Sequence, residues 1–407
     1  MARSRLDVGL LFATRIARLF AYGLISVVLV LYLSTVGLGT GEIGLLLTLT
    51  LAGDAIISLW LTTWADRIGR RRTLIIGALL MLCAGVAFVL TQNPLLLTLA
   101  AVFGVISPSG NEIGPFLSIE QASLSQLVPD KQRTHIFAWY NLVGSFATAT
   151  GALCSGLIAQ QLVDTGWAPQ DGYRAVIAGY ACVGLLLLLA FLALSPAVEP
   201  PRTATAQPAR LFLGLHKSRA IVFKLSALFA LDAFAGAFVV QSIVAYWFNV
   251  RFGADVQTIG AIFFAANILA GVSALLAARI AARFGLINTM VFTHIPSNIL
   301  LMLVPLMPTL PSAVAVMLVR FSISQMDVPT RQSYTMAVVA PDERSAAAGV
   351  TGIARSVGAA AAPALSGALL AGALTFSAPF FIAGGLKIVY DLLLYRSFKS
   401  TKPPEEQ

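Results

Sequence analysis

The stretch Trp64-Ala65-Asp66-Arg67-Ile68-Gly69-Arg70-Arg71-Arg72 lies between two long apolar runs and decides how this chain is organised. It places five charges within the seven positions from Asp66 to Arg72, whereas only 11% of the whole chain is charged. A short basic loop between two membrane-length helices is retained on the cytoplasmic side of a bilayer. The stretch therefore predicts a cytoplasmic loop that joins two membrane-spanning helices.

The composition of the chain indicates a membrane protein. Of 407 residues, 58% are hydrophobic, more than a soluble domain of ordinary composition contains. The net charge of +9 would favour nucleic-acid binding in a soluble protein, but here the basic residues lie in short loops, so we expect no nucleic-acid partner. The cysteines Cys83, Cys154 and Cys182 lie in apolar runs without paired spacing, so neither a disulfide framework nor a cysteine metal site is expected.

The apolar runs predict twelve membrane-spanning helices of about 20 residues each. The first apolar run follows a basic N-terminus and is long. We therefore expect it to be an uncleaved membrane helix and not a signal peptide. The predicted spans are 8–33, 42–64, 73–91, 95–118, 134–162, 173–194, 221–248, 258–281, 289–307, 312–338, 345–371 and 377–395. A Pro-rich, polar segment at 195–219 predicts a cytoplasmic linker, with six-helix halves at 1–194 and 220–396 and a cytoplasmic tail at 397–407.

The distribution of Lys and Arg predicts the orientation of these helices. With the N-terminus inside, 19 of the 27 basic residues fall on inner segments, and only Arg174 and Arg251 fall on outer loops. The excess of basic residues on cytoplasmic loops then places both termini in the cytoplasm, in a plasma (inner) membrane.

An internal repeat supports two similar halves. Shifting the chain by 216 residues places Gly37 on Gly253 and Gly69 on Gly285, and Ala65-Asp66-Arg67-Ile68-Gly69 on Ala281-Ala282-Arg283-Phe284-Gly285. Two similar halves in the same orientation form a parallel repeat, as in several transporter folds.

Together, the Asp-Arg-x-Gly-Arg-Arg-Arg loop, the twelve spans and the repeat resemble the major facilitator superfamily over nearly the whole chain. The resemblance implies an all-α membrane fold with two six-helix halves related by a pseudo-twofold axis. Thr62 departs from the family, which usually has Gly there. The resemblance also implies that Asp66 meets the N-terminus of helix 11 near Ser345 and stabilises the outward-facing state. The loop and gating residues are then Asp66, Arg67, Gly69, Arg70 and Arg71, with Arg15 on helix 1.

Ionisable residues within membrane helices are costly and usually face a cavity or a partner. Twelve occur here, and eight lie on helices 1, 4, 7 and 10, which line the central cavity of the resembled fold. We interpret this concentration as a path for substrate or protons. The predicted path residues are Arg320, Glu112, Asn111, Asp232, Asp327, Arg331, Asp54 and Gln241.

Helix 10 carries the clearest pattern. Arg320, Ser324, Asp327 and Arg331 are spaced by four, three and four, so they share one helix face, and Asp327 is able to pair with Arg331. Arg320 either binds a carboxylate or phosphate of the substrate through its guanidinium fork or pairs with an acid such as Glu112. Asp327 and Arg331 are expected to have a structural or gating role.

Helix 4 contains Ser107-Pro-Ser-Gly-Asn-Glu-Ile-Gly-Pro115, which predicts a bent helix with exposed carbonyls. Asn111 and Glu112 project from this bend, either as a substrate or proton site or as a satisfied kink with an Arg partner. Glu120 is expected to be a gate or a solvated residue.

Two further acids and one base leave alternatives open. Arg15 and Asp232 stand at nearly equivalent places in the two halves and either form a salt bridge across the cytoplasmic mouth or, for Arg15, extend to the lipid headgroups. Asp54 is either a proton carrier or a packing partner.

We therefore predict a secondary active transporter of a small organic solute that works by alternating access, as a proton-coupled efflux antiporter. The alternatives are a permease for small organic anions, in either direction, or a non-transporting sensor or lipid-handling protein on the same scaffold. The expected partners are a small-molecule substrate, protons or another coupling ion, and membrane lipids, and we expect a monomer. No enzyme activity, cofactor or metal is expected, because no phosphate-binding loop occurs and His135, His216 and His294 are far apart in the chain.

Overall fold

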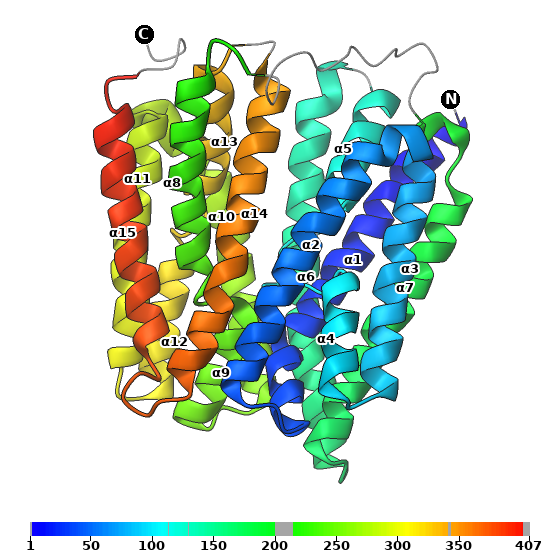
Figure 1. Ribbon diagram of the computed structural model, residues 1–407, viewed down its shortest axis with the longest axis vertical. Coiled ribbons are helices and arrows are strands. Elements are labelled where there is room, and N and C mark those ends of the chain that lie inside the picture. The colour runs from blue at the N-terminus through cyan, green and yellow to red at the C-terminus, as the bar shows by residue number, and fades with distance from the viewer. Residues whose placement is uncertain (1, 113, 129, 200–214, 341–342, 402–407) are drawn as a thin grey trace. The chain divides into compact units, whose positions relative to one another are not determined.

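The structure is a computed structural model that describes residues 2–112, 114–128, 130–199, 215–340 and 343–401. Every regular element within these ranges is a helix, as Figure 1 shows, and this confirms the predicted all-α fold. The first helices are α1 (Ala2–Thr35), α2 (Thr40–Ile68), α3 (Arg70–Leu90), α4 (Pro94–Phe103), α5 (Phe116–Leu127), α6 (Asp130–Asp164), α7 (Pro169–Ala193) and the short η1 (Pro196–Val198). After the linker follow α8 (Arg219–Ala237), α9 (Gln241–Phe252), α10 (Val256–Phe284), α11 (Leu286–Leu303), η3 (Val304–Leu306), α12 (Leu310–Phe321), α13 (Asp327–Val338), α14 (Arg344–Leu370) and α15 (Ala378–Phe398).

Ten helical stretches in the described ranges are long and apolar enough to cross a membrane. The predicted spans 95–118 and 312–338 are not continuous helices. The first is divided into α4 and α5, and the second into α12 and α13. The predicted span 221–248 is also divided, between α8 and α9. The count of twelve membrane crossings stays a prediction.

The chain forms two compact units. Unit 1 contains Met1–Thr205 and Gln241–Phe264, and unit 2 contains Ala206–Val240 and Ala265–Gln407. Helix α9 therefore belongs to unit 1, where it packs against α1. The predicted division placed residues 241–264 in the second half, and the two sequence-based halves stay a prediction.

In unit 1 the central contact joins α1 and α6, and glycines make it close. A Cβ on Gly23 would lie 2.2 Å from the Thr148 carbonyl oxygen, and a Cβ on Gly151 would lie 2.0 Å from that of Phe20. Small residues at such crossings allow the backbones of membrane helices to approach closely. The polar side chains of α1 are thereby held against α6 and its neighbours.

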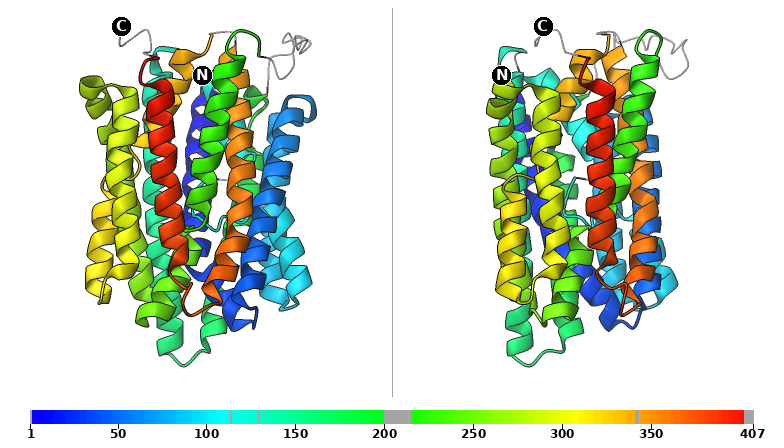
Figure 2. Two further views of the ribbon diagram at one scale, coloured as in Figure 1. Left: turned by 60° about the vertical axis from the view of Figure 1, so that its left-hand side comes forward. Right: turned by 90° about the vertical axis from the view of Figure 1, so that its left-hand side faces the viewer.

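In unit 2, helix α8 packs against α14 and α15, and Figure 2 shows these green, orange and red helices side by side. Gly358 of α14 faces Ala230 of α8, where an added Cβ would lie 2.3 Å from the Ala230 carbonyl oxygen. Helix α11 covers α15 and α13. The buried apolar core between these helices includes Leu225, Phe229, Met290, Val291, Tyr334, Tyr390 and Leu394.

Candidate functional site

The break between α4 and α5 places a non-helical segment inside unit 1. Pro108 and Pro115 lie in it, and both Gly110 (φ 70°) and Gly114 (φ 79°) have left-handed backbones. Val105 has φ 53°, a conformation that costs a β-branched residue about 1–3 kcal/mol and is found mostly at functional sites. The predicted bend is thus a complete interruption of the helix.

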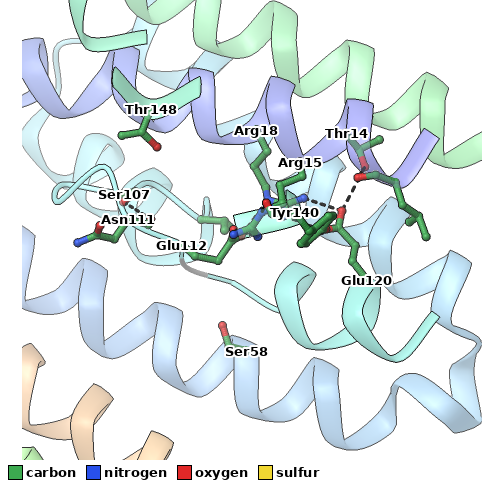
Figure 3. Close-up of polar contacts among 12 residues, drawn as sticks. Thr14, Arg15, Arg18, Ser58, Ser107, Asn111, Glu112, Glu120, Tyr140 and Thr148 are labelled. Carbon is green, nitrogen blue, oxygen red and sulfur yellow. Dashed lines mark hydrogen bonds and ion pairs between the residues drawn. The ribbon is translucent and has the colours of Figure 1, made fainter. Parts of the chain in front are cut away.

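Nearby hydroxyl groups satisfy part of the freed backbone. Ser107 Oγ donates to the Asn111 carbonyl oxygen at 2.8 Å, and Thr148 Oγ1 donates to that of Gly110 at 3.3 Å. Non-helical backbone at membrane depth is tolerated where it is buried in protein or lines a cavity. The Asn111 side chain is exposed and projects away from the break, as Figure 3 shows.

Two arginines of α1 and two glutamates form a buried charge cluster in unit 1, shown in Figure 3. Arg18 Nη1 and Nη2 contact Glu120 Oε1 and Oε2, both at 2.7 Å. Glu112 bridges the two arginines, with Arg15 Nη1 at 2.7 Å and Arg18 Nε at 2.9 Å. Two positive and two negative charges make this cluster neutral overall, which reduces the cost of burying it.

The neighbours of the cluster complete its hydrogen bonds. Arg15 Nε donates to the Tyr140 carbonyl oxygen at 2.7 Å, the Tyr140 hydroxyl donates to Glu120, and Thr14 Oγ1 donates to Glu120 at 3.2 Å. Two of the alternatives that the sequence left open are therefore wrong, namely headgroup contact for Arg15 and a solvated Glu120. Arg15 is buried within unit 1 and does not extend to the headgroups, and Glu120 is fully buried and not solvated, because each has an ion-pair partner.

The two other predicted path residues of unit 1 have few contacts. Asp54 of α2 accepts a hydrogen bond from Ser58 Oγ at 3.3 Å and lies beside the backbone of Gly114 in the break. Among the described residues, no cation lies within ion-pair distance of Asp54. Gln241 Nε2, at the start of α9, donates to Ser26 Oγ of α1 at 2.8 Å.

The break between α12 and α13 places Arg320 and Asp327 at two facing helix ends in unit 2. Arg320 lies in the last turn of α12 and Asp327 in the first turn of α13, so each charge has the sign that its helix dipole favours. Within the described chain, no carboxylate lies within ion-pair distance of Arg320, and its Nε has no hydrogen-bond partner. A guanidinium with a buried, unpartnered Nε is a candidate ligand for an anion.

Asp232 of α8 is the centre of a second buried charge cluster. It contacts Lys387 Nζ at 2.6 Å, Arg331 Nη1 at 3.1 Å and Arg355 Nη1 at 3.3 Å. The predicted pair of Asp327 and Arg331 is present at 3.0 Å. Three positive and two negative charges leave this cluster with a net charge of +1 before Arg320 is counted.

Arg355 is the accessible member of the cluster. Its side chain is 35% exposed, whereas those of Asp232, Arg331 and Lys387 are 5%, 7% and 11% exposed. Among the described residues, the guanidinium contacts Asp232 through Nη1, and its other donors have no partner there. The Asp232 partners all lie within unit 2, and those of Arg15 all lie within unit 1.

The basic loop after α2 has structural partners that the sequence pattern does not indicate. Gly69 has φ 107° between α2 and α3, and Glu199 accepts hydrogen bonds from the Arg70 and Arg71 amides at 2.7 and 3.2 Å. Arg71 donates to the carbonyls of Phe191 and Leu192 at the C-terminus of α7.

The structure does not describe the side chains of Asp66 and Arg67, nor that of Ser345, the expected neighbour of Asp66. Their gating role stays a prediction.

Three residues of these clusters belong to the twelve intramembrane ionisable residues but not to the predicted path residues. Arg18, Arg355 and Lys387 are intramembrane cations, and this cost alone marks them as candidates. Sequence spacing could not predict the partners of these cations. Arg18 pairs with Glu120 and Lys387 pairs with Asp232, and the two members of each pair are far apart in the sequence.

Comparison with known proteins identifies the family. The family model described as Major Facilitator Superfamily matches residues 11–363 and 234–407. The chain belongs to the major facilitator superfamily. A relative from Saccharomyces cerevisiae, the uncharacterized membrane protein YJR124C, is 31% identical over 417 residues, covering 95% of this chain and 93% of the relative.

Solved transporters share the fold of this superfamily member. The D-xylose–proton symporter has a TM-score of 0.76 at 16% identity, covering 99% of both chains. A bacterial homologue of the human lysosomal transporter Spinster has a TM-score of 0.75 at 15% identity, covering 98% of both chains. The nucleoside transporter NupG has a TM-score of 0.73 at 15% identity, covering 97% of this chain and all of that one. The protein is therefore an integral, multi-pass membrane transporter of a solute.

Proposed function

We propose that this superfamily member transports small organic anions and binds them in unit 2. The observation that carries the proposal is the set of three cations around Asp232, with Arg355 partly exposed among them. Asp327 is the second acid in the cluster, so one positive charge stays uncompensated. A carboxylate or phosphate group would supply the missing negative charge and accept the free Arg355 donors.

The interrupted helices support the position of the site. In transporters with internal repeats, short or interrupted segments at corresponding places in the two halves are the best sequence indication of the binding site. Here α4/α5 and α12/α13 are such segments, and they correspond in the predicted repeat. The last turn of α12, next to the break in unit 2, carries Arg320, a guanidinium without an ion-pair partner in the described chain.

The charge balance of the two units supports an anion over a cation. The Arg15, Arg18, Glu112 and Glu120 cluster of unit 1 is neutral and its members contact one another. The cluster of unit 2 is positive, so it would repel a solute cation.

Efflux, antiport, the plasma-membrane location, cytoplasmic termini and the monomeric state stay predictions from the sequence.

Transport into sealed proteoliposomes tests this function. The panel contains lactate, benzenesulfonate and glycerol 3-phosphate as anions, with tetraphenylphosphonium as a lipophilic cation and xylose as a neutral solute. We expect at least one anion to be transported, and Arg355→Gln to lower its kcat/KM by about 10- to 100-fold, the loss of one charge-assisted contact.

Arg251→Gln is the matched control, because Arg251 is exposed at the end of α9. This variant should transport like the wild type. Transport of the cation or xylose but of no anion would contradict the proposed function, as would an anion transport rate that Arg355→Gln and Arg320→Gln both leave unchanged.

A further inference from the structure

A buried histidine–aspartate pair lies in unit 2 and has no part in the function proposed above. His294 of α11 contacts Asp391 of α15, with 2.9 Å between Nδ1 and Oδ1. Asn298, one turn further along α11, donates through Nδ2 to the other oxygen of Asp391 at 3.3 Å. The two helices pack against each other along this contact.

The pair is shielded from solvent but not fully satisfied. His294 is 5% exposed, and Asp391 and Asn298 are 0% exposed. The Asn298 Oδ1 atom has no hydrogen-bond partner although it is buried. An imidazole beside a carboxylate holds an exchangeable proton, and the gain of one further proton raises the charge of the pair by one.

The pair is connected to the proposed anion site through α15. Lys387 and Asp391 are four residues apart, so they lie on the same face of this helix, one turn from each other. Lys387 in turn holds Asp232 at 2.6 Å, and Asp232 contacts the accessible Arg355. The route from His294 to Arg355 therefore consists of the His294–Asp391 contact, one helical turn of α15 and two further ion pairs.

Several charged and titratable groups lie on the helices packed around this pair. Helix α8 contributes Asp232, α12 contributes Arg320, α13 contributes Asp327 and Arg331, α14 contributes Arg355, and α15 contributes Lys387, Tyr390 and Asp391. With Asp391 ionised and His294 neutral, these groups comprise four cations and three anions, a net charge of +1. One added proton raises this charge to +2.

We propose that His294 and Asp391 form a proton-binding site whose occupancy strengthens anion binding in unit 2, so that a proton and the anion bind together. This inference rests on the proposed function. A proton taken from water binds to the pair and breaks no covalent bond. The added positive charge favours an anion at Arg355, and by linkage the bound anion favours the proton equally. Joint binding supports cotransport of anion and proton, in contrast to the antiport predicted from the sequence.

The first experiment measures anion binding as a function of pH. Lactate and benzenesulfonate are suitable radiolabelled probes, because both stay fully ionised between about pH 6 and pH 8, where histidine usually titrates. We expect wild-type affinity to rise by about fivefold or more as the pH falls over this range, a typical coupling magnitude. His294→Asn and Asp391→Asn should each make the affinity independent of pH while leaving binding measurable.

Asp164→Asn is the matched control, because Asp164 is an exposed acid at the end of α6 and has no place in the predicted path. Its pH dependence should equal that of the wild type. Loss of the pH dependence in Asp54→Asn but not in His294→Asn would overturn the inference and assign the proton to unit 1. His294→Gln is a second variant in case His294→Asn does not fold, as judged by size-exclusion chromatography.

The second experiment needs no anion. The chain contains three histidines, so protein isotope-labelled at the imidazole Cε1 carbon gives three carbon NMR signals, and His294→Asn identifies the one from His294. If the pair binds a proton, this signal changes between about pH 5 and pH 9, and Lys387→Met alters that change because Lys387 lies one helical turn from Asp391. A signal that keeps one protonation state over this range would overturn the inference. Titration of His294 with Lys387 coupling but without binding of any probe would support the proton site and contradict only the proposed function.

Discussion

Arg18 and Glu120 form a two-point ion pair in which both nitrogen–oxygen distances are 2.7 Å and neither side chain is exposed. The pair joins α1 to α5 directly after the break, so it fixes the segment that carries Glu112. Removal of one partner leaves a buried charge without compensation, which costs more than the intact pair contributes.

Single substitutions of this pair should therefore be strongly destabilising. Arg18→Gln or Glu120→Gln is expected to lower the free energy of unfolding by about 3–5 kcal/mol, as for other buried pairs that lose one partner. The double variant should lose clearly less than the sum of the two, because no unpaired charge remains between these positions. Chemical unfolding in detergent measures all three proteins. Additive losses would show that the two side chains do not act as a pair.

The contact between Gly358 and Ala230 predicts a packing defect of defined position. An added Cβ at Gly358 would lie 2.3 Å from the Ala230 carbonyl oxygen, so Gly358→Ala must separate α14 from α8. We expect a loss of about 1–3 kcal/mol in stability, the usual cost of overpacking. Gly352→Ala on the same helix has no atom within 4 Å of the new Cβ and should be nearly neutral. Equal melting temperatures for both variants would contradict this close contact.

Glu343 predicts a loss of stability in acid. Burial tends to raise the pKa of this carboxyl, but hydrogen bonds from Ser218 and from the His216 and Lys217 amides outweigh burial and lower the pKa from 4.5 to about 2. Because the folded pKa is below the unfolded one, the carboxylate contributes its stability above about pH 4.5 and loses it as the pH falls toward about 2.

A melting-temperature profile between about pH 2 and pH 6 measures this contribution. Glu343→Gln should lower the melting temperature near pH 6 and reduce the further fall in acid relative to the wild type. Asp164→Asn, at an exposed position at the end of α6, should retain the wild-type profile. An unchanged profile in Glu343→Gln would show that this carboxylate does not hold the segment before α8.

The sequence predicted the features that depend on local spacing or composition. The basic loop after α2, the apolar spans and the i, i+4 pair of Asp327 and Arg331 all follow from residues within one or two turns of each other. The first helix break was indicated by the prolines and glycines of residues 107–115. The second break, at residues 322–326, contains neither residue type, so its sequence gave no comparable signal.

The partners of the buried charges could not be predicted in the same way. Arg18 and Glu120 are 102 residues apart, and Lys387 and Asp232 are 155 apart. The cost of burying an ionised side chain predicts that each has a partner but does not say which one. The alternative of a solvated Glu120 was wrong for this reason. The amide contacts of Glu199 and Glu343 were missed because both acids lie outside the apolar spans.

The charge of the transported solute is the central claim, and counterflow with matched solutes in wild-type proteoliposomes tests it most directly. Each pair differs in charge but little in size, namely lactate against propane-1,2-diol and benzenesulfonate against benzenesulfonamide. The positive cluster around Asp232 predicts that at least one anion exchanges across the membrane and that its neutral counterpart does not. Exchange of the neutral solutes or of tetraphenylphosphonium, without exchange of any anion, would contradict an anion site in unit 2.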